Sequence, residues 1–329
     1  MNQAEDLAVR AVPAGEAAEL RSFLDHAASA TLFHEPSFLA YHPEGRFAFH
    51  PLAVVRGGRI VAYLPGGIAA QDGRPVFRSP LGASFGGSVL AARTSAADTL
   101  ALLRCLQDHA QREGWSGIDL TPPPSIYRRD GSDTLGFGLH ASGFTLASRM
   151  LCAALHLHGT APRFPSLYRS RNVTKTRAAQ RLGVETTIGG SELLEAFQVV
   201  FDATYERHGV AATHSMAELR DLMQRLPDRF QIVLARHQGR PVAGLFLMRM
   251  SEAVSNAFYI CSSSEDAEIN AGLAMFAWVM DHLGDSGTQT LDLGPASMPD
   301  GSLNRGVCFF KEGLGAFGYC RDRWVWNAT

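Results

Sequence analysis

The sequence predicts an α+β fold built from two similar halves. Each half shows short apolar runs separated by a turn, then a long amphipathic helix, then a short buried strand. The hairpin of the first half spans residues 49–64, and that of the second half spans 232–250. A chain of 329 residues also exceeds what one hydrophobic core usually holds. We therefore expect an N-terminal domain over residues 1–160 and a C-terminal domain over residues 161–329.

The elements of the first half follow from apolar periodicity and from turn residues. Arg56-Gly57-Gly58 separates two apolar runs and is typical of a hairpin turn. Leu100, Leu103 and Leu106 recur at helical spacing. In order, we expect a strand at 7–12, a helix at 16–28, hairpin strands at 49–55 and 59–64, a helix at 96–113, a strand at 117–120, a loop-rich segment at 136–143 and a closing strand at 145–157.

The second half repeats this order with stronger signals. Leu273, Phe276 and Met280 follow a helical period. Ser215 is a natural N-cap, with Glu218 three residues later as a capping box. In order, we expect a basic helix within 168–181, a helix at 192–208, a helix from Ser215, strands at 232–235, 241–250 and 256–261, a helix at 271–283, a strand at 290–294 and a helix at 304–315.

Composition excludes several classes of protein. Hydrophobic residues make up 46% of the chain, charged residues 19%, and the net charge is −2, so no global basic surface for nucleic acid is expected. The five cysteines are scattered without a Cys-x-x-Cys pair, which favours reduced thiols in a cytoplasmic protein and no metal site. No apolar run approaches the roughly 18–20 residues that span a bilayer, and the N-terminus lacks the pattern of a signal peptide. We expect a cytoplasmic protein without membrane insertion.

Two segments are candidates for ligand contact. The Gly- and Ser-rich stretch 78–87, with Ser84 and Gly86, can bring backbone close to a ligand, or it can be an ordinary connecting loop. The stretch 168–181 carries five basic residues and no acid, so it can bind phosphates or form a solvated helix face. Serine-hydrolase, P-loop and zinc-protease motifs are absent from the sequence.

The order of elements resembles a known family. Asp292-Leu293-Gly294, followed by Phe310-Lys311 and Gly315, is similar to the C-terminal half of tandem proteins with the N-acetyltransferase (GNAT) fold. The resemblance covers roughly residues 165–325 and is to Fem-type peptidoglycan-bridge aminoacyltransferases and to nucleotide-sugar N-acyltransferases of surface-polysaccharide pathways. In the first half, segments 33–41 and 78–87 resemble the polysaccharide-pathway members.

The resemblance implies a fold and an activity. The fold is two GNAT-like domains, each a mixed sheet flanked by helices, facing each other across a cleft. The activity is transfer of an acyl group from acyl-CoA to an amine, most simply an amino group on a nucleotide-linked sugar. The alternatives are a Fem-type transferase that uses aminoacyl-tRNA, and a non-catalytic module that binds nucleotide sugars. A coenzyme A thioester is the expected co-substrate, with no metal, and tRNA is the less expected partner.

The resemblance also implies three catalytic residues, each with a structural alternative. Lys311 would steady the acyl carbonyl, or it is an exposed helix lysine. Asp292 would accept a proton from the amine, or it caps the next helix or holds Arg305. Tyr259 would protonate the leaving thiolate, or it is a core residue.

Further residues are expected to bind substrates. Arg207, at a helix end, resembles an arginine that contacts the nucleotide diphosphate in Fem-type enzymes, or it is a cation facing the helix dipole. Segment 262–272 has one glycine and three acids, which makes a poor phosphate cradle and places the donor between the halves or near residues 84–87. The other candidates for substrate binding are Arg171, His34, Ser84, Gly86, Tyr127 and Asn304.

Overall fold

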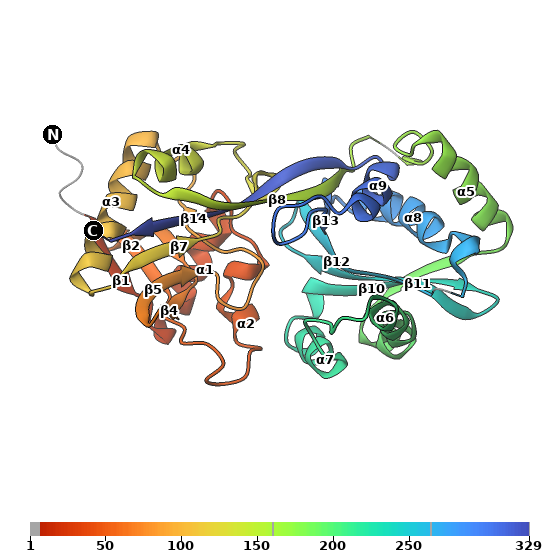
Figure 1. Cartoon of the computed structure of the whole chain (residues 1–329), viewed down its shortest axis with the longest axis horizontal. Coiled ribbons are helices and arrows are strands. Elements are labelled where there is room, and N and C mark those ends of the chain that lie inside the picture. Colours follow the sequence, from red (N-terminus) through yellow and green to blue (C-terminus); the bar gives the residue numbers. More distant parts are fainter. Residues whose placement is uncertain (1–6, 160, 264, 329) are drawn as a thin grey trace. The chain divides into compact units, whose positions relative to one another are not determined.

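The chain divides into two compact units in a computed structural model (Figure 1). The structure describes residues 7–159, 161–263 and 265–328. One unit contains Met1–Met150 and Cys320–Thr329, and the other contains Leu151–Tyr319. These units differ from the expected ranges 1–160 and 161–329, because the final strand returns to the first unit and pairs there.

Unit 1 contains two sheets. In the first, antiparallel strands follow the order β1-β2-β3-β6, and in the second the order within the unit is β4-β5-β7-β14-β8. Its elements are β1 (Leu7–Ala11), η1 (Ala14–Glu16), α1 (Ala17–His26), η2 (Leu32–His34), α2 (Pro36–Leu39), β2 (Leu52–Arg56), β3 (Arg59–Leu64), β4 (Gly67–Gln71), β5 (Arg74–Ser79), β6 (Val89–Leu90), α3 (Ala96–Arg112), β7 (Gly117–Leu120), η3 (Ser125–Tyr127), α4 (Thr134–Ala141) and the first part of β8 (Thr145–His156).

The core of unit 1 lies between α3, α4 and the strands. Leu102, Leu103 and Leu106 of α3 pack with Leu135 and Leu139 of α4 in one buried cluster. The prediction of a loop-rich segment at 136–143 is wrong, because most of these residues belong to α4. The β2–β3 hairpin is confirmed, with the register Leu52↔Leu64 to Arg56↔Arg59.

Unit 2 contains one mixed sheet with strand order β8-β13-β12-β11-β10-β9. Strands β9 to β12 are antiparallel, and β12 and β13 are parallel. The elements are α5 (Ser170–Arg181), β9 (Glu185–Gly189), η4 (Ser191–Leu193), α6 (Leu194–His208), α7 (Met216–Arg225), η5 (Pro227–Arg229), β10 (Phe230–His237), β11 (Arg240–Arg249), β12 (Val254–Ser262), η6 (Ala267–Ile269), α8 (Ala271–Asp285), β13 (Thr290–Pro295), α9 (Arg305–Gly313) and β14 (Phe317–Asn327), which continues into unit 1.

Helices cover both faces of the unit 2 sheet. Helices α6 and α7 lie on one face of β10–β12, and α8 lies on the other (Figure 1). Phe276 and Met280 of α8 pack with Leu245, Ala257 and Leu291 of the sheet, because the apolar stripe of the helix needs burial. The capping box of α7 is confirmed, with Ser215 accepting from the Glu218 N–H. The α+β prediction is confirmed by these mixed sheets and their flanking helices.

In the part of the chain that the structure describes, no helix is long and apolar enough to cross a membrane.

Candidate active site

Two parallel strands of unit 2 separate at the centre of the sheet. Strands β12 and β13 pair from Val254↔Thr290 to Asn256↔Asp292. Beyond this rung β12 continues to Ser262, whereas β13 pairs with β8 on its other side. The rung Asn256↔Asp292 is therefore the vertex of a gap between two strands, where backbone groups of β12 become available to a ligand that pairs like a strand.

A β-bulge lies immediately after this vertex. Ala257 pairs with Leu247 and Tyr259 pairs with Phe246, so Phe258 is the extra residue of β12. A bulge interrupts the hydrogen-bond ladder and redirects the local backbone groups. The backbone N–H groups near Phe258 are thus candidates to hold an oxyanion at the vertex.

The corresponding parallel pair of unit 1 stays closed. Strands β5 and β7 pair from Val76↔Gly117 to Ser79↔Leu120. The Thr121 N–H then donates to the Ser79 carbonyl at 2.8 Å, which extends the pairing past the end of β7. The described part of unit 1 therefore offers no comparable gap at this pair.

A cavity of about 330 Å³ lies beside the open pair in unit 2. The cavity is on the α8 face of the sheet, since Ile260 packs against the core cluster that contains the buried residues of α8. The end of β12, the N-terminal turn of α8, and side chains of α5 and α9 form its walls. Lining residues include Arg171, Lys175, Ile260, Gly272, Phe309 and Phe310.

Asp292 is the buried carboxylate of the vertex. It is 3% exposed and points away from α8, because its neighbours Leu291 and Leu293 pack in the α8 core. It accepts hydrogen bonds from the Asn256 side chain at 2.8 Å, the Gly294 N–H at 2.7 Å and the Tyr319 hydroxyl at 2.5 Å. The alternative of capping the next helix is wrong, because Asn304 performs that task.

Asn256 was missed by the sequence analysis. Its side-chain N–H₂ donates to Asp292, while its Oδ1 is buried and has no hydrogen-bond partner among the described residues. A buried acceptor without a partner costs about 1–3 kcal/mol of folding free energy, which marks the vertex as a place where a donor group is needed. The only sequence signal is a polar residue within an apolar strand.

Lys311 is buried, which corrects the alternative of an exposed helix lysine. The side chain extends from α9, and its Nζ donates to the carbonyls of Leu293 at 2.6 Å, Gly294 at 3.1 Å and Pro295 at 2.6 Å. Burial lowers the pKa of the Lys311 ammonium to about 8, although nearby Asp292 acts to raise it. The three hydrogen bonds that Nζ donates hold the end of β13. The ammonium must therefore break one of these hydrogen bonds before it can bind an acyl carbonyl.

Lys311→Met is expected to lower the free energy of unfolding at pH 7 by about 2–3 kcal/mol, because three carbonyls lose their common donor. Turnover is expected to fall as well, since the end of β13 borders the gap. Chemical denaturation and thiol release from acetyl-CoA measure the two effects. A loss of turnover with unchanged stability would show instead that the ammonium acts on the substrate.

Tyr259 lies on the face opposite the cavity. Its ring packs against Phe201 and Tyr205 of α6, with centroid distances of 5.0 and 6.0 Å. Its hydroxyl lies 2.7 Å from His214 Nδ1 and accepts from the His214 N–H at 3.2 Å. The structure thus places Tyr259 in an aromatic core next to the vertex, and its role as an acid stays a prediction.

Arg207 and Asn304 occupy helix ends. Arg207 is exposed in the last turn of α6 and donates to the Ser262 carbonyl at 3.4 Å. Asn304 is the N-cap of α9, where its Oδ1 accepts from the Val307 N–H at 3.2 Å. Capping of α9 is a sufficient structural reason for an asparagine at position 304. Arg207 lies at the end of β12, whereas Arg171 lines the cavity directly.

His34 and Gly86 of unit 1 bind each other. His34 is fully buried; its Nδ1 accepts from the Thr31 N–H at 3.1 Å, and its Nε2 lies 3.1 Å from the Gly86 carbonyl. Burial lowers the pKa of His34 to about 4. The neutral ring is therefore part of the core, which makes His34 a support for the 78–87 loop.

The glycines of that loop pack against protein. A Cβ on Gly86 would lie 3.1 Å from Ser79 Oγ. Gly87 has a φ of +64°, and a Cβ built on it would lie 2.6 Å from Pro122. Ser84 is exposed, and Tyr127 is buried with its ring 4.8 Å from Phe85. These contacts favour a structural role for Gly86 and Tyr127, whereas Ser84 is accessible to a ligand.

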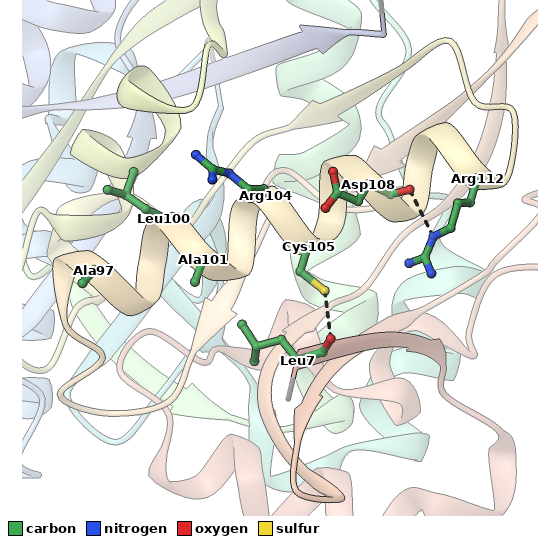
Figure 2. Close-up of a pocket in the computed structure, with 8 residues that line it drawn as sticks. All are labelled: Leu7, Ala97, Leu100, Ala101, Arg104, Cys105, Asp108 and Arg112. Atoms are coloured by element: carbon green, nitrogen blue, oxygen red, sulfur yellow. Dashed lines mark hydrogen bonds between the residues drawn. The ribbon is translucent and has the colours of Figure 1, made fainter. Parts of the chain in front are cut away.

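A second cavity, of about 630 Å³, lies in unit 1 along one face of α3 (Figure 2). Arg104, Asp108 and Arg112 line it, and Cys105 Sγ donates to the Leu7 carbonyl at 3.5 Å. Residues 1–6, which precede Leu7, lie outside the described part of the chain, so we assign no ligand to this cavity. Across the described ranges, no cluster of three or more His, Cys, Asp or Glu residues is suited to a metal ion.

Comparisons with known proteins show which domain and which folds the chain resembles. A family model described as an acetyltransferase (GNAT) domain matches residues 167–301, which contain the open strand pair. Similar solved structures include FemX (TM-score 0.74, 14% identity, 97% of each chain covered) and L-PGS from Bacillus licheniformis (0.60, 14%, 95% of this chain and 91% of that one). A tandem GNAT protein from the clavulanic acid biosynthesis pathway also matches (0.54, 14%, 98% and 99%). No curated protein sequence matches the chain significantly.

These likenesses confirm the GNAT-like fold over nearly the whole chain. The predicted arrangement of the two halves across a cleft stays a prediction. The match of residues 167–301 to an acetyltransferase (GNAT) domain supports an acyltransferase.

Proposed function

We propose that the protein transfers an acyl group from acyl-CoA to an amine, with the donor bound in unit 2. The observation that carries this proposal is the opening of β12 and β13 beyond Asn256↔Asp292, with a cavity beside it. An amide-bearing arm that enters the gap can pair with the free edge of β12. Such pairing fixes the thioester at the vertex and so supplies the positioning that amide formation requires.

The groups at the vertex suit this chemistry. The amine attacks the thioester carbonyl, the C–N bond forms, the C–S bond breaks and the thiolate leaves. The N–H groups near the bulge at Phe258 stabilise the oxyanion, and Asp292 accepts the proton that the amine loses. Asp292 and the cavity lie on opposite faces of the sheet, so donor and amine approach the vertex from different sides.

For the acceptor we propose an amino group on a nucleotide-linked sugar, as in surface-polysaccharide pathways. Arg207 supports this choice, because it is an exposed cation at the end of β12 that can pair with a diphosphate. The resemblance of segments 33–41 and 78–87 to polysaccharide-pathway transferases supports it independently.

Isothermal titration with coenzyme A and acetyl-CoA tests the donor. Micromolar binding, followed by thiol release when an amine is added, is the expected result. Binding without turnover across amino-sugar nucleotides would favour a non-catalytic module. Absence of coenzyme A binding would refute the acyl-CoA donor.

Arg207→Ala is expected to weaken binding of a UDP-linked amino sugar about tenfold or more, because charge-assisted contacts to phosphate are lost. Coenzyme A affinity and thermal stability should stay unchanged, since the side chain is exposed. Arg225→Ala on α7 is the matched control, because Arg225 is also an exposed arginine in the last turn of a helix. Equal acceptor affinity in the Arg207 variant and the wild type would remove Arg207 from the site.

A Fem-type reaction with an aminoacyl-tRNA donor is the second candidate. The observation in its favour is the likeness to FemX, which covers 97% of both chains at a TM-score of 0.74. Binding of an acceptor-stem RNA, with no binding of coenzyme A, would favour this donor.

A further inference from the structure

We propose that α5, together with Phe309 of α9, anchors the phosphate groups of the donor in the unit 2 cavity. This inference deepens the proposed function, since it names the groups that select a phosphorylated donor. The anchor consists of Arg171, Lys175 and Phe309, all of which line the cavity.

The placement of α5 directs two cations at the cavity. Asn172, Thr176 and Ala179 form the buried side of the helix and pack against the rest of unit 2. Arg171 and Lys175 are exposed, and they are one helical turn apart, so they project from the same stripe. Arg177 and Arg181 belong to a different stripe and do not line this cavity. Helix α5 thus presents one pair of cations to the cavity and another pair away from it.

Phe309 orients the Arg171 guanidinium. The guanidinium carbon lies 3.6 Å from the centroid of the Phe309 ring, which is 49% exposed. A guanidinium placed over a ring face keeps N–H groups available at its edge, and these groups can make a bidentate contact with phosphate. The contact with Arg171 also gives a physical reason for a large apolar ring at the surface.

The opposite wall is compatible with anions. It is the N-terminal turn of α8, a helix of 15 residues whose first N–H groups border the cavity at Ala271 and Gly272. Asp266 is the acidic residue that lines the cavity, and its carboxylate is paired with Arg240 at 3.1 Å. Because segment 262–272 lacks the glycines of a phosphate cradle, the cations of α5 supply the attraction that this loop does not.

The test compares a phosphorylated ligand with a phosphate-free one. Arg171→Ala/Lys175→Ala is expected to raise the Kd for coenzyme A about 30- to 100-fold, with no change in the Kd for pantetheine, which has no phosphate. Arg171→Lys should produce part of this loss, because an ammonium cannot make the bidentate contact. The salt dependence of coenzyme A binding should also weaken in the double variant.

Arg177→Ala/Arg181→Ala is the matched control, with the same charge change on the same helix. It should leave coenzyme A affinity unchanged, and both double variants should keep the wild-type Tm. Coenzyme A affinity within twofold of wild type in Arg171→Ala/Lys175→Ala would overturn the anchor while leaving the acyl-CoA donor intact. An equal loss in the control would also overturn it, because the effect would then be general charge.

Acceptor-stem RNA separates the inference from the proposed donor. If the wild type binds this RNA but not coenzyme A, and only the Arg171/Lys175 variant loses the RNA, then the anchor holds and the acyl-CoA donor fails. If the wild type binds neither ligand, both the anchor and the donor proposal are overturned.

Discussion

Gly272→Leu is expected to reduce coenzyme A affinity at least 100-fold without harming the fold. Gly272 lies in the first turn of α8 and lines the cavity, and a Cβ built there meets no atom within 4 Å. A leucine side chain would therefore extend into the space proposed for the donor. Glycine is a poor helix residue, so the substitution should keep stability or raise it by about 0.5–1 kcal/mol. Calorimetry with coenzyme A and thermal unfolding measure the two effects.

Gly306→Leu is the matched control for this variant. Gly306 lies in the first turn of α9, where a Cβ approaches only Asn304 Oδ1, at 3.9 Å, and it does not line the unit 2 cavity. The control should bind coenzyme A like the wild type. Wild-type affinity in Gly272→Leu would exclude this cavity as the donor site and would return attention to the exposed loop at Ser84.

Acid is expected to destabilise unit 1 through His34. The pKa of this buried ring is about 4 in the folded state, against 6.5 for an ordinary histidine. At a pH between these two pKa values, the unfolded chain therefore binds a proton on His34 that the folded chain does not bind. The stability is fully present above pH 6.5 and is lost as the pH falls toward 4, by about 3 kcal/mol, since each unit of pKa shift corresponds to about 1.4 kcal/mol.

Denaturant unfolding at a series of pH values measures this loss. His34→Gln cannot titrate, so its stability should fall less steeply between pH 6.5 and 4, although it starts from a lower value at pH 7. The same slope in the variant and the wild type would show that other groups cause the acid response. Because His34 contacts the Gly86 carbonyl, the protection of amides in the 78–87 loop against hydrogen exchange, corrected for the intrinsic exchange rate at each pH, should fall over the same pH range.

Local sequence signals predicted most elements of unit 2 because their patterns are strong. The β10–β11 hairpin follows from two short apolar runs separated by a polar turn, and α8 follows from a period of 3.6 residues. In unit 1, Gly136 and Gly138 suggested a loop, yet α4 forms there. A Cβ at Gly138 would lie 2.6 Å from Thr99 Cγ2, so the glycine allows α4 to approach α3. Packing between helices therefore decides a position that local propensity assigns to a loop.

The sequence by itself determined the fold class and singled out the segments that we propose to carry chemistry. The order of the elements, together with Asp292-Leu293-Gly294 and Phe310-Lys311, was what made the second half resemble GNAT-like proteins. The basic character of α5 was equally plain, since charge is a property of composition.

Only the tertiary structure decided what these groups contact. It placed Asn256 opposite Asp292, directed the Lys311 ammonium to three carbonyls, and joined Arg171 to Phe309, which lies far from it in the sequence. It also showed that His34 is buried against the 78–87 loop, whereas Gly272 faces an open cavity. Such contacts depend on strand register and helix packing, and these are set by burial of the whole apolar surface rather than by neighbours in the chain.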